Sequence, residues 1–351
     1  METQHKRRVR YSGTHPKTFQ EKYKEHNPEK YADTIEKVIS KGSTPAGTHI
    51  SIMVKEILDF LQIRPGQTGL DATLGYGGHT KEMLKCLDGQ GHLFALDVDP
   101  IESAKTRERL ANLGFGEEIL TVRLQNFADV DQVTLDTGKK FDFVLADLGV
   151  SSMQIDNPER GFSYKIDGPL DLRMNPYKGT SAAERLQELT QEEIQGMLIE
   201  NADEPYAQEI AARIIRWRQT GKTITTTTDL RTVISEALCY VPKAEKEEAV
   251  KKSCQRTFQA LRIDVNSEFE VLYSFLEKLP HVLNPGARVA ILTFHSGEDR
   301  IVKRLFKDQQ KEGFYSEVSK DVIRPSAEEC ARNGRARSTK MRWAIRAEDA
   351  E

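Results

Sequence analysis

Three glycines and an acidic residue stand close together in the segment DATLGYGGHT, residues 71–80. The glycines are Gly75, Gly77 and Gly78, and Asp71 precedes them in the strand-like segment TGLDATL. Glycine lets a ligand approach the backbone, and amides at the start of the following helix can face that ligand. The spacing is G-x-G-G rather than the G-x-G-x-x-G of dinucleotide-binding folds, so the loop alone is a weak signal.

A second acidic residue, Asp97, ends the apolar segment HLFALD, 22 residues after Gly75. A carboxylate at this point can accept hydrogen bonds from both hydroxyls of a ribose. The alternative is that Asp97 only caps the next helix, but Asp99 and Pro100 already provide an N-cap and a first-turn proline. The glycine loop and Asp97 together predict a nucleoside-containing cofactor.

Two such cofactors differ in the charge that they bring to the loop. NAD carries a pyrophosphate, which an acidic residue would repel, whereas S-adenosylmethionine carries an ammonium and a sulfonium. Asp71 lies directly before the loop. A carboxylate there favours the methyl donor over NAD.

The elements that position these residues alternate between strands and helices. Strand-like segments are TGLDATL, GHLFALDVD, ILTVRLQ and KKFDFVLADLG, and helical segments include HTKEMLKCL and DPIESAKTRERLANL. An amphipathic helix is expected over residues 50–62. This alternation predicts an α/β fold with a parallel, doubly wound sheet covered by helices on both faces.

The alternation stops after residue 155. A loop rich in glycine and proline follows, and then a block with helical periodicity and two capping-box pairs, Ser181 with Glu184 and Thr190 with Glu193. Sheet signals return with GARVAILTF at 286–294. We therefore expect a basic, partly ordered arm at 1–47, a core formed by 48–155 and 255–351, and an inserted all-helical domain at 156–254.

Charge and composition describe a cytoplasmic globular protein. Of the 351 residues 38% are hydrophobic and 30% charged, and no apolar run approaches the length of a membrane span. The net charge of −3 predicts no general affinity for nucleic acid, but residues 331–346 hold six Lys or Arg and no acid. Such a basic segment can bind phosphates or can simply be a solvated charged face.

The cysteines give no sign of a metal or of covalent catalysis. Cys86, Cys239, Cys254 and Cys330 are far apart and form no C-x-x-C pair, so we expect no metal site. None stands in the Pro-Cys or Thr-Cys context that methylation of a cytosine C5 atom would need.

Six longer segments occur in order along the chain: DATLGYGGHT, ALDVDP, DLGVSSMQIDNPERGFSYKIDGPLDLRM, RTFQALRIDVNSEFEVL, ILTFHSGEDRIVK and GRARSTKMR. Together they resemble the bacterial 16S ribosomal RNA cytosine-N4 methyltransferase family (RsmH/MraW type), from about residue 49 to 346. The family's usual F-H-S-L-E-D is FHSGED here, with Gly297 in place of leucine.

The resemblance implies a class I, Rossmann-like S-adenosylmethionine-dependent methyltransferase fold with a helical insertion. It implies methylation of the exocyclic N4 of one cytidine in 16S rRNA, with the small ribosomal subunit as partner, and we leave a homodimer open. It also implies cofactor contacts, which join the acids and glycines named above, at Gly77, Gly78, His79, Asp97, Phe127, Asp147 and Gln154.

Transfer to an amine needs an aligned nucleophile and an acceptor for its hydrogen. Asp147, at the end of the strand FDFVLA, is the leading acceptor, and the alternative for it is a turn cap. Ser151 and Ser152 could bond the base. His295, after the strand VAILTF, could contact RNA, shuttle a proton or make a structural hydrogen bond. The stacking ring would come from Phe162, Tyr164 or Phe294, each of which can instead be a core residue.

Arginines could hold RNA phosphates. The candidates are Arg160, Arg173, Arg256, Arg262, Arg335 and Arg337. Some of them can make structural ion pairs instead.

Three alternatives remain at this point. The first is a related enzyme that methylates a different RNA cytosine, and the second is a ribosome assembly factor that binds the cofactor and RNA without catalysis. An NAD dehydrogenase is the third. The intact glycine loop, Asp97 and Asp147 favour catalysis.

Overall fold

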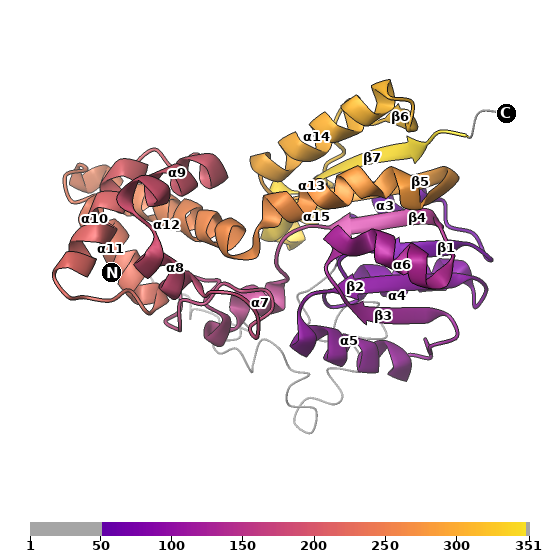
Figure 1. Cartoon of the computed structure of the whole chain (residues 1–351), viewed down its shortest axis with the longest axis horizontal. Coiled ribbons are helices and arrows are strands. Elements are labelled where there is room, and N and C mark those ends of the chain that lie inside the picture. The colour runs from indigo at the N-terminus through magenta and orange to yellow at the C-terminus, as the bar shows by residue number, and fades with distance from the viewer. Residues whose placement is uncertain (1–50, 349–351) are drawn as a thin grey trace, which may run out of the picture. The chain divides into compact units, whose positions relative to one another are not determined.

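A seven-stranded sheet forms the centre of the computed structural model, which describes residues 51–348 (Figure 1). The predicted arm at 1–47 lies outside the described residues. The strand order is β3-β2-β1-β4-β5-β7-β6. Their bounds are Thr68–Asp71 (β1), His92–Asp97 (β2), Leu120–Leu124 (β3), Phe141–Asp147 (β4), Leu283–Thr293 (β5), Tyr315–Val318 (β6) and Lys340–Arg346 (β7).

The first five strands are parallel, and β7 pairs antiparallel with both β5 and β6. After β3 the chain returns to place β4 on the other side of β1, so the strand order reverses between β1 and β4. Ligands of open α/β sheets bind beyond the carboxyl ends of the strands at such a reversal. This doubly wound, mainly parallel sheet agrees with the fold class that the alternation of strands and helices predicts.

Residues alternate between the two faces of the sheet, as the period of a strand requires. In β2, Phe94 and Leu96 pack with α6 (Val130–Thr137), α13 (Glu268–Lys278) and α14 (Ser296–Lys311). Leu93 and Ala95 face α3 (Val54–Leu61), α4 (Gly78–Leu87) and α5 (Pro100–Asn112) on the opposite side. Both faces are thus covered, which explains the nearly continuous apolar runs of the central strands.

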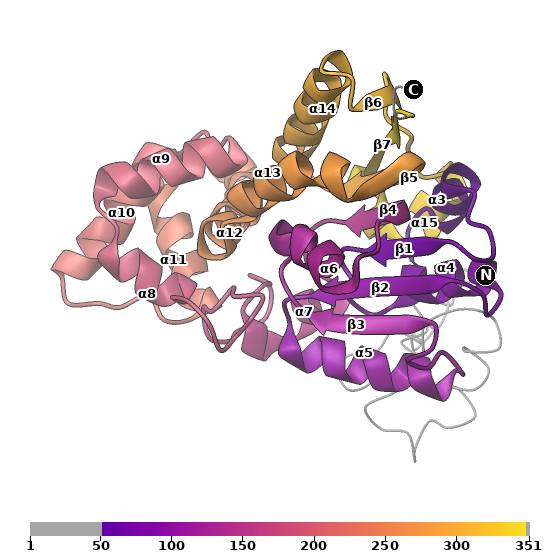
Figure 2. The same cartoon turned by 45° about the vertical axis from the view of Figure 1, so that its right-hand side comes forward.

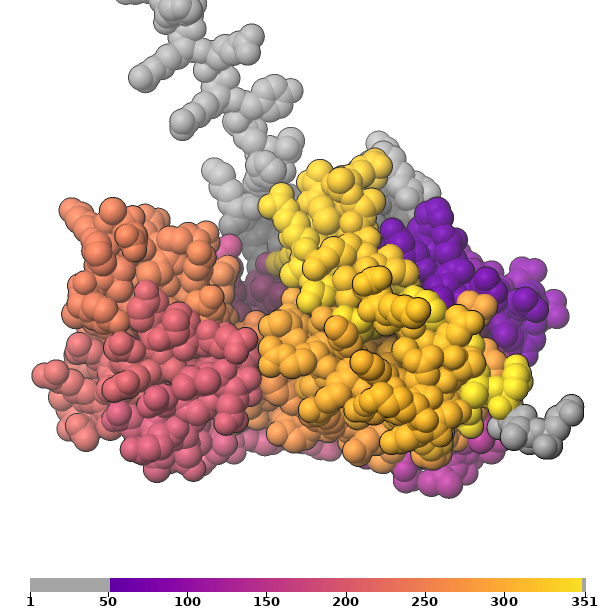
Figure 3. Space-filling model, turned by 90° about the horizontal axis from the view of Figure 1, so that it is seen from above, coloured from indigo at the N-terminus to yellow at the C-terminus, as the bar shows by residue number. Residues whose placement is uncertain are grey.

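A second group of helices packs around its own apolar core, and we call these helices the helical part. They are α8 (Ala182–Glu188), α9 (Gln191–Ala202), α10 (Ala207–Gln219), α11 (Thr227–Ala237) and α12 (Lys243–Asn266). Figure 2 shows the helical part on the side toward which the arrowheads of β3 and β4 point. In Figure 3 its red and salmon residues lie beside the orange residues of α13 and α14.

Helix α12 runs through the expected boundary at residues 254 and 255. Its Phe258 and Leu261 still belong to the core of the helical part. The chain changes direction only at Ser267, where a positive φ of 49° separates α12 from α13. Sequence periodicity could not locate this joint, because both sides of it are amphipathic helix.

Local capping agrees with the sequence. The Asp99 side chain accepts hydrogen bonds from the amides of Ile101 and Glu102, with Pro100 in the first turn of α5. Ser181 and Thr190 form the two expected capping boxes. The helices α6 and α7 (Ser152–Asp156) were not expected. Within the described residues, no helix is long and apolar enough to cross a membrane.

Candidate active site

Three aspartates end neighbouring parallel strands at the carboxyl edge of the sheet. They are Asp71 on β1, Asp97 on β2 and Asp147 on β4. The parallel register places all three at one edge, where the strand order reverses. The structure therefore brings together the acids that the sequence singled out, although they are far apart along the chain.

The glycine loop is held to this edge by Asp97. The Gly75 amide donates to Asp97 Oδ2 at 2.9 Å, and the Asp99 amide donates to Asp97 Oδ1 at 2.8 Å. Burial is the main cause that raises the pKa of Asp97 to about 6, and the nearby carboxylates of Asp99 and Asp71 add to it. Because Asp99 caps α5, the helix-cap alternative for Asp97 is excluded.

The backbone conformation and the packing of the protein itself, and not only the approach of a ligand, favour glycine in this loop. Gly75 and Gly77 have positive φ of 48° and 77°, which residues with a side chain rarely adopt. A Cβ on Gly77 would lie 2.7 Å from Thr106 Cγ2, and one on Gly78 would collide with the Ser51 hydroxyl. Only at Gly75 is the space around the missing side chain open, with Thr73 O at 3.8 Å.

Asp71 has an internal role. Its side chain is buried, accepts from Thr80 Oγ1 at 2.6 Å and from the Thr73 amide at 3.1 Å, and so joins β1 to α4. Burial raises its pKa above the ordinary value. Because only 1% of Asp71 is exposed, it can act on a bound cation through its electric field but not by contact.

Asp147 has a free acceptor. Its Oδ1 is buried and has no hydrogen-bond partner among the described residues, although the side chain as a whole is 28% exposed. Its Oδ2 lies 3.5 Å from His79 Nδ1. The main cause that raises the pKa of Asp147 to about 6 is burial, which the carboxylates of Asp71 and Glu298 reinforce and His79 opposes. The Asp147 amide donates to Thr73 Oγ1 at 2.6 Å, which fixes the strand end.

Asp99 is a buried hub that the sequence did not reveal. While Oδ1 caps α5, Oδ2 accepts from Gln154 Nε2 at 2.9 Å and from Arg160 Nη1 at 2.7 Å. Gln154 also completes a capping box with Ser151 at the start of α7. Arg160 further donates to the carbonyls of Arg173 and Met174. The predicted cofactor contact Gln154 and the predicted RNA contact Arg160 thus meet on the same carboxylate.

The aromatic candidates divide into two sets. Phe127 is partly buried, follows the end of β3, and stacks edge-on against Phe275 with ring centroids 5.1 Å apart. Phe162 belongs to the apolar core of the helical part, and the partly buried Tyr164 packs against that core. The partly buried Phe294 packs against the core on the α3 side of the sheet. The core interpretation therefore accounts for Phe162. Ser152 is buried in the first turn of α7.

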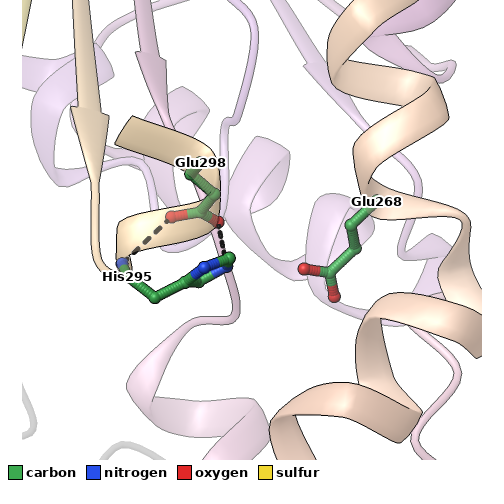
Figure 4. A group of neighbouring side chains, drawn as sticks. All are labelled: Glu268, His295 and Glu298. Carbon is green, nitrogen blue, oxygen red and sulfur yellow. Dashed lines mark hydrogen bonds and ion pairs between the residues drawn. The ribbon is translucent and has the colours of Figure 1, made fainter. Parts of the chain in front are cut away.

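His295 lies between two glutamates just beyond β5 (Figure 4). Its Nε2 is 3.2 Å from Glu298 Oε1, while Glu298 Oε2 accepts the Phe294 amide at 2.8 Å. Although burial opposes it, His295 and Arg262 lower the pKa of Glu298. Gly297 leaves room for a neighbouring ring, since a Cβ there would lie 2.7 Å from Phe269 Cζ. This packing accounts for the glycine where the family usually has leucine.

The donor set Glu268, His295 and Glu298 could in principle hold a metal ion, because its ligand atoms lie within 4.8 Å of one another. However, Arg262 already engages both oxygens of Glu268, at 2.7 and 3.0 Å. A divalent cation would have to displace this guanidinium. We interpret the group as an ion-pair cluster that joins α12, α13 and α14.

Four of the six predicted RNA-binding arginines make ion pairs within the chain. Arg160 pairs with Asp99, Arg173 with Asp171, Arg262 with Glu268 and Arg335 with Asp156. Arg160 is buried as well, so its guanidinium does not face a phosphate. Arg256 and Arg337 make no ion pair within residues 51–348, and Arg337 is exposed. Lys340 and Arg342, in the basic segment 331–346, likewise form ion pairs with Asp299.

The chain is similar to known proteins along nearly its whole length. The profile described as the MraW methylase family matches residues 46–347. A protein of Lachnoclostridium phytofermentans named ribosomal RNA small subunit methyltransferase H 1 is 72% identical over 343 residues, which cover 98% of this chain and 93% of that protein. A protein of the same name in Agathobacter rectalis is 68% identical over 347 residues, 99% of each chain.

A more distant relative keeps the likeness. Ribosomal RNA small subunit methyltransferase H of Koribacter versatilis is 40% identical over 303 residues, 85% of this chain and 94% of that protein. A solved structure titled as a putative rRNA methylase from Clostridium thermocellum has a TM-score of 0.42 and 11% identity, covering 85% of this chain and 99% of that one. The family profile and the relatives span nearly the whole chain, and the chain belongs to the MraW methylase family.

Proposed function

We infer that the protein transfers a methyl group from S-adenosyl-L-methionine to the N4 amine of a cytidine in 16S rRNA. The observation that carries this function is the Asp147 carboxylate, which ends β4 with a buried oxygen that no described residue occupies. An unpaired buried acceptor is costly for a fold, and such groups are typical of functional sites. The family and the names of its members agree with this function.

The residues at the sheet edge fit the cofactor. The partly exposed carboxylate of Asp97 keeps lone pairs for ribose hydroxyls while it holds Gly75. We propose that the partly buried ring of Phe127 contacts adenine and that the loop around Gly75, Gly77 and Gly78 borders the amino-acid tail. The cofactor supplies an electrophilic methyl group.

Asp147 acts on the nucleophile. The N4 lone pair of cytosine is delocalised into the ring, so the amine is a poor nucleophile until a hydrogen-bond acceptor draws it toward a pyramidal shape. We propose that Asp147 Oδ1 accepts the N4–H bond. The fixed strand end then positions the amine, which lowers the entropic part of the barrier.

Access of the base requires an unpaired, unstacked nucleotide, because the acceptor oxygen of Asp147 is buried. We propose that Arg256 and Arg337, together with the arm at 1–47, provide cations for RNA phosphates. The 16S rRNA would be met in the cytoplasm as part of the small ribosomal subunit. A homodimer stays a prediction.

We also propose the predicted division into a methyltransferase core and an inserted helical domain. The separate apolar core of the helical part supports it. Because α12 continues through residue 255, the joint at Ser267 is a better boundary than the expected one.

The direct test is transfer of tritiated methyl groups to small ribosomal subunits from a strain that lacks this protein. Mass spectrometry of the RNA then locates the modified base. We expect one N4-methylcytidine per subunit in 16S rRNA. Label in another RNA would indicate a different target, and no transfer to any RNA would leave only a binding role for the protein.

A further inference from the structure

The His79 side chain is held in a defined tautomer by the backbone. Its Nε2 lies 2.9 Å from the carbonyl oxygen of Ile52, and His79 is only 9% exposed. A carbonyl can only accept a hydrogen bond, so Nε2 must carry the hydrogen. This assigns the protonation of the ring from its partner. The other ring nitrogen, Nδ1, is then an acceptor in the neutral imidazole.

That acceptor faces another acceptor. Nδ1 lies 3.5 Å from Asp147 Oδ2, which is a carboxylate oxygen. Two lone pairs that face each other repel, whereas one proton between them turns the contact into a charge-assisted hydrogen bond. The geometry therefore has a place for one proton between Nδ1 and Oδ2, once the 3.5 Å separation closes to hydrogen-bond length.

The surroundings of the pair are acidic. Asp71 on β1 and Glu298 on α14 both act on Asp147, and neither donates a hydrogen bond to it. The remaining oxygen of Asp147, Oδ1, has no partner among the described residues. A single proton at the His79 side would neutralise part of this charge and would leave Oδ1 free for the substrate.

We propose that His79 and Asp147 form a proton-holding pair that takes up the proton released from the substrate amine. This inference rests on the proposed function. During transfer the S–CH3 bond breaks, its electron pair stays on sulfur, and an N4–CH3 bond forms. The N4–H bond then breaks, its electrons remain on nitrogen, and its proton passes to Asp147 Oδ1. Rotation of the protonated carboxyl group about Cβ–Cγ then brings this proton to the side of His79 Nδ1. No further reactant is needed for this balance.

Binding of S-adenosylmethionine is expected to displace the proton that His79 and Asp147 share. A sulfonium beside the Asp147 carboxylate supplies a positive charge, so it disfavours the shared proton. The demethylated product carries a neutral thioether in its place. The pair is therefore expected to release a proton when S-adenosylmethionine binds and to keep it when S-adenosylhomocysteine binds.

Isothermal titration calorimetry can count these protons without any turnover. The heat of binding is measured between pH 6 and 8 in two buffers that differ in their ionisation enthalpy. Any proton released by Asp97 is the same for both ligands, since both contain the adenosine ribose. We expect the wild-type protein to release more protons with S-adenosylmethionine than with S-adenosylhomocysteine, by up to about one. Equal proton counts would overturn the proposal.

Variants of His79 and Asp147 test whether these two side chains hold the proton that is counted. His79→Gln can still donate to the Ile52 carbonyl but cannot hold a proton, so the difference between the ligands should vanish above pH 7. Asp147→Asn should remove it at every pH. His92→Gln is the matched control, because His92 begins β2 at the opposite edge of the sheet and contacts Thr121. A difference that persists in His79→Gln above pH 7 would exclude His79.

The pH dependence of single-turnover methyl transfer gives a second readout. The acidic limb of the wild-type profile should move by about one pH unit or more in His79→Gln, whereas a merely structural loss would lower the rate equally at all pH values. If the wild-type protein methylates 16S rRNA but this limb and the proton counts do not change, the proton-holding pair is wrong and the proposed function stands.

Discussion

Asp147 Oδ1 combines two properties that are rarely found together in a folded chain, because it is buried and has no hydrogen-bond partner within residues 51–348. We expect Asp147→Asn to reduce methyl transfer by about 100-fold to 10,000-fold, the range for loss of an acid–base group. Cofactor affinity should change much less, because the ribose contact assigned to Asp97 is untouched. Single-turnover rates and calorimetric affinities measure the two effects.

The matched control for this variant is Asp136→Asn. Asp136 is an exposed aspartate near the C-terminal end of α6, where it pairs with Arg123. It should keep wild-type rates. Transfer at wild-type rate in Asp147→Asn would remove Asp147 from the mechanism.

Asp97 makes cofactor binding depend on pH. Its pKa is raised to about 6, so the carboxylate loses its charge as the pH falls through that value. Ribose hydroxyls donate best to the ionised form, and affinity should therefore rise with pH and level off above 6. Below 6 it should fall about tenfold per pH unit if only the ionised form binds. The readout is S-adenosylhomocysteine affinity, because that ligand lacks the sulfonium that acts on Asp147.

The sign of this effect can be checked with Asp97→Asn. That variant should bind weakly at every pH and show no slope near pH 6. For the free protein, the raised pKa means that the folded state binds more protons than the unfolded chain between about pH 4 and 6. Asp97 therefore lowers the free energy of unfolding as the pH rises through this window. Affinity that is flat from pH 5 to 8 in the wild-type protein would contradict the role of Asp97.

Strand-end acids could be predicted from the sequence because each follows an apolar run directly. Asp97 and Asp147 were identified in this way. The hydrogen bonds of Asp99 with Gln154 and Arg160 could not be predicted in this way, because these partners lie 55 and 61 residues further along the chain. Only the local half of its role, the cap of α5, leaves a pattern in the sequence.

At the scale of elements, the turn from β1 into α4 depends on Gly77. Gly77→Ala should lower the free energy of unfolding by about 1–3 kcal/mol, because a positive φ is strained for alanine and Thr106 Cγ2 stands in the way. Thr106 cannot easily turn aside, since its hydroxyl donates to the Gly75 carbonyl at 2.7 Å. Denaturant unfolding measures the change.

Thr106→Ser separates the two causes, because it removes Cγ2 and keeps the hydroxyl. In the double variant the steric part should be recovered and the φ strain should remain. If close approach of the cofactor is the reason for the glycine, the double variant will bind the cofactor poorly despite its recovered stability. Near wild-type affinity would show that the turn needs glycine for its own packing.

The buried pair of Arg160 with Asp99 joins the loop after α7 to the start of α5. The side chains are 8% and 1% exposed. Arg160→Ala leaves the Asp99 carboxylate buried with only Gln154 and backbone amides, and it should lower the free energy of unfolding by about 3–5 kcal/mol. Thermal or denaturant unfolding measures this loss.

Arg185→Ala is the comparison for that variant. Arg185 pairs with Asp264 at a similar distance, 2.8 Å, but these side chains are 34% and 20% exposed. Removing a pair so open to solvent should change the free energy of unfolding by about 0–1 kcal/mol. Equal losses in the two variants would show that burial does not set the strength of the Arg160 pair.

The sequence predicted whether an element is a helix or a strand wherever a single local residue pattern distinguishes the two. The strands of the sheet have apolar runs, and Ser181 and Thr190 mark helix starts by their capping spacing. Helix α6 was missed because it is only eight residues long and only its Val130 and Val133 are buried. The joint at Ser267 was missed because a positive φ at serine has no sequence signature.

For the whole molecule, the order of the strands could be anticipated only as a class. The alternation of strands and helices predicts a doubly wound sheet, and the family resemblance adds its inserted helices. The position of β7 between β5 and β6 depends on long-range pairing, such as Ala290 with Trp343, that no local pattern encodes. The charge of the basic segment 331–346 was equally ambiguous, because ion pairs such as Arg342 with Asp299 depend on the fold.

Most of the Lys and Arg side chains in the basic segment 331–346 form ion pairs with neighbouring acids. These side chains are therefore less available to bind RNA phosphates. Residues 1–47 contain ten Lys or Arg and six Asp or Glu, a surplus of four positive charges. We therefore predict that deletion of residues 1–40 weakens binding to small ribosomal subunits by about tenfold or more at physiological salt, because each phosphate contact contributes counterion release. Cofactor affinity should stay within about twofold, since the sheet edge is unchanged.

Filter binding to subunits over a range of salt concentrations tests this prediction. The slope of log affinity against log salt should become shallower by roughly the number of phosphate contacts that the arm makes. A matched control replaces the lysines and arginines of residues 1–40 with glutamine at full length, which separates charge from chain length. If this control binds as tightly as the wild-type protein while the deletion does not, the arm contributes through something other than its charge. An unchanged slope of log affinity against log salt in the deletion variant would indicate that the arm makes no phosphate contacts. RNA binding would then be assigned to Arg256, Arg337 and the sheet edge.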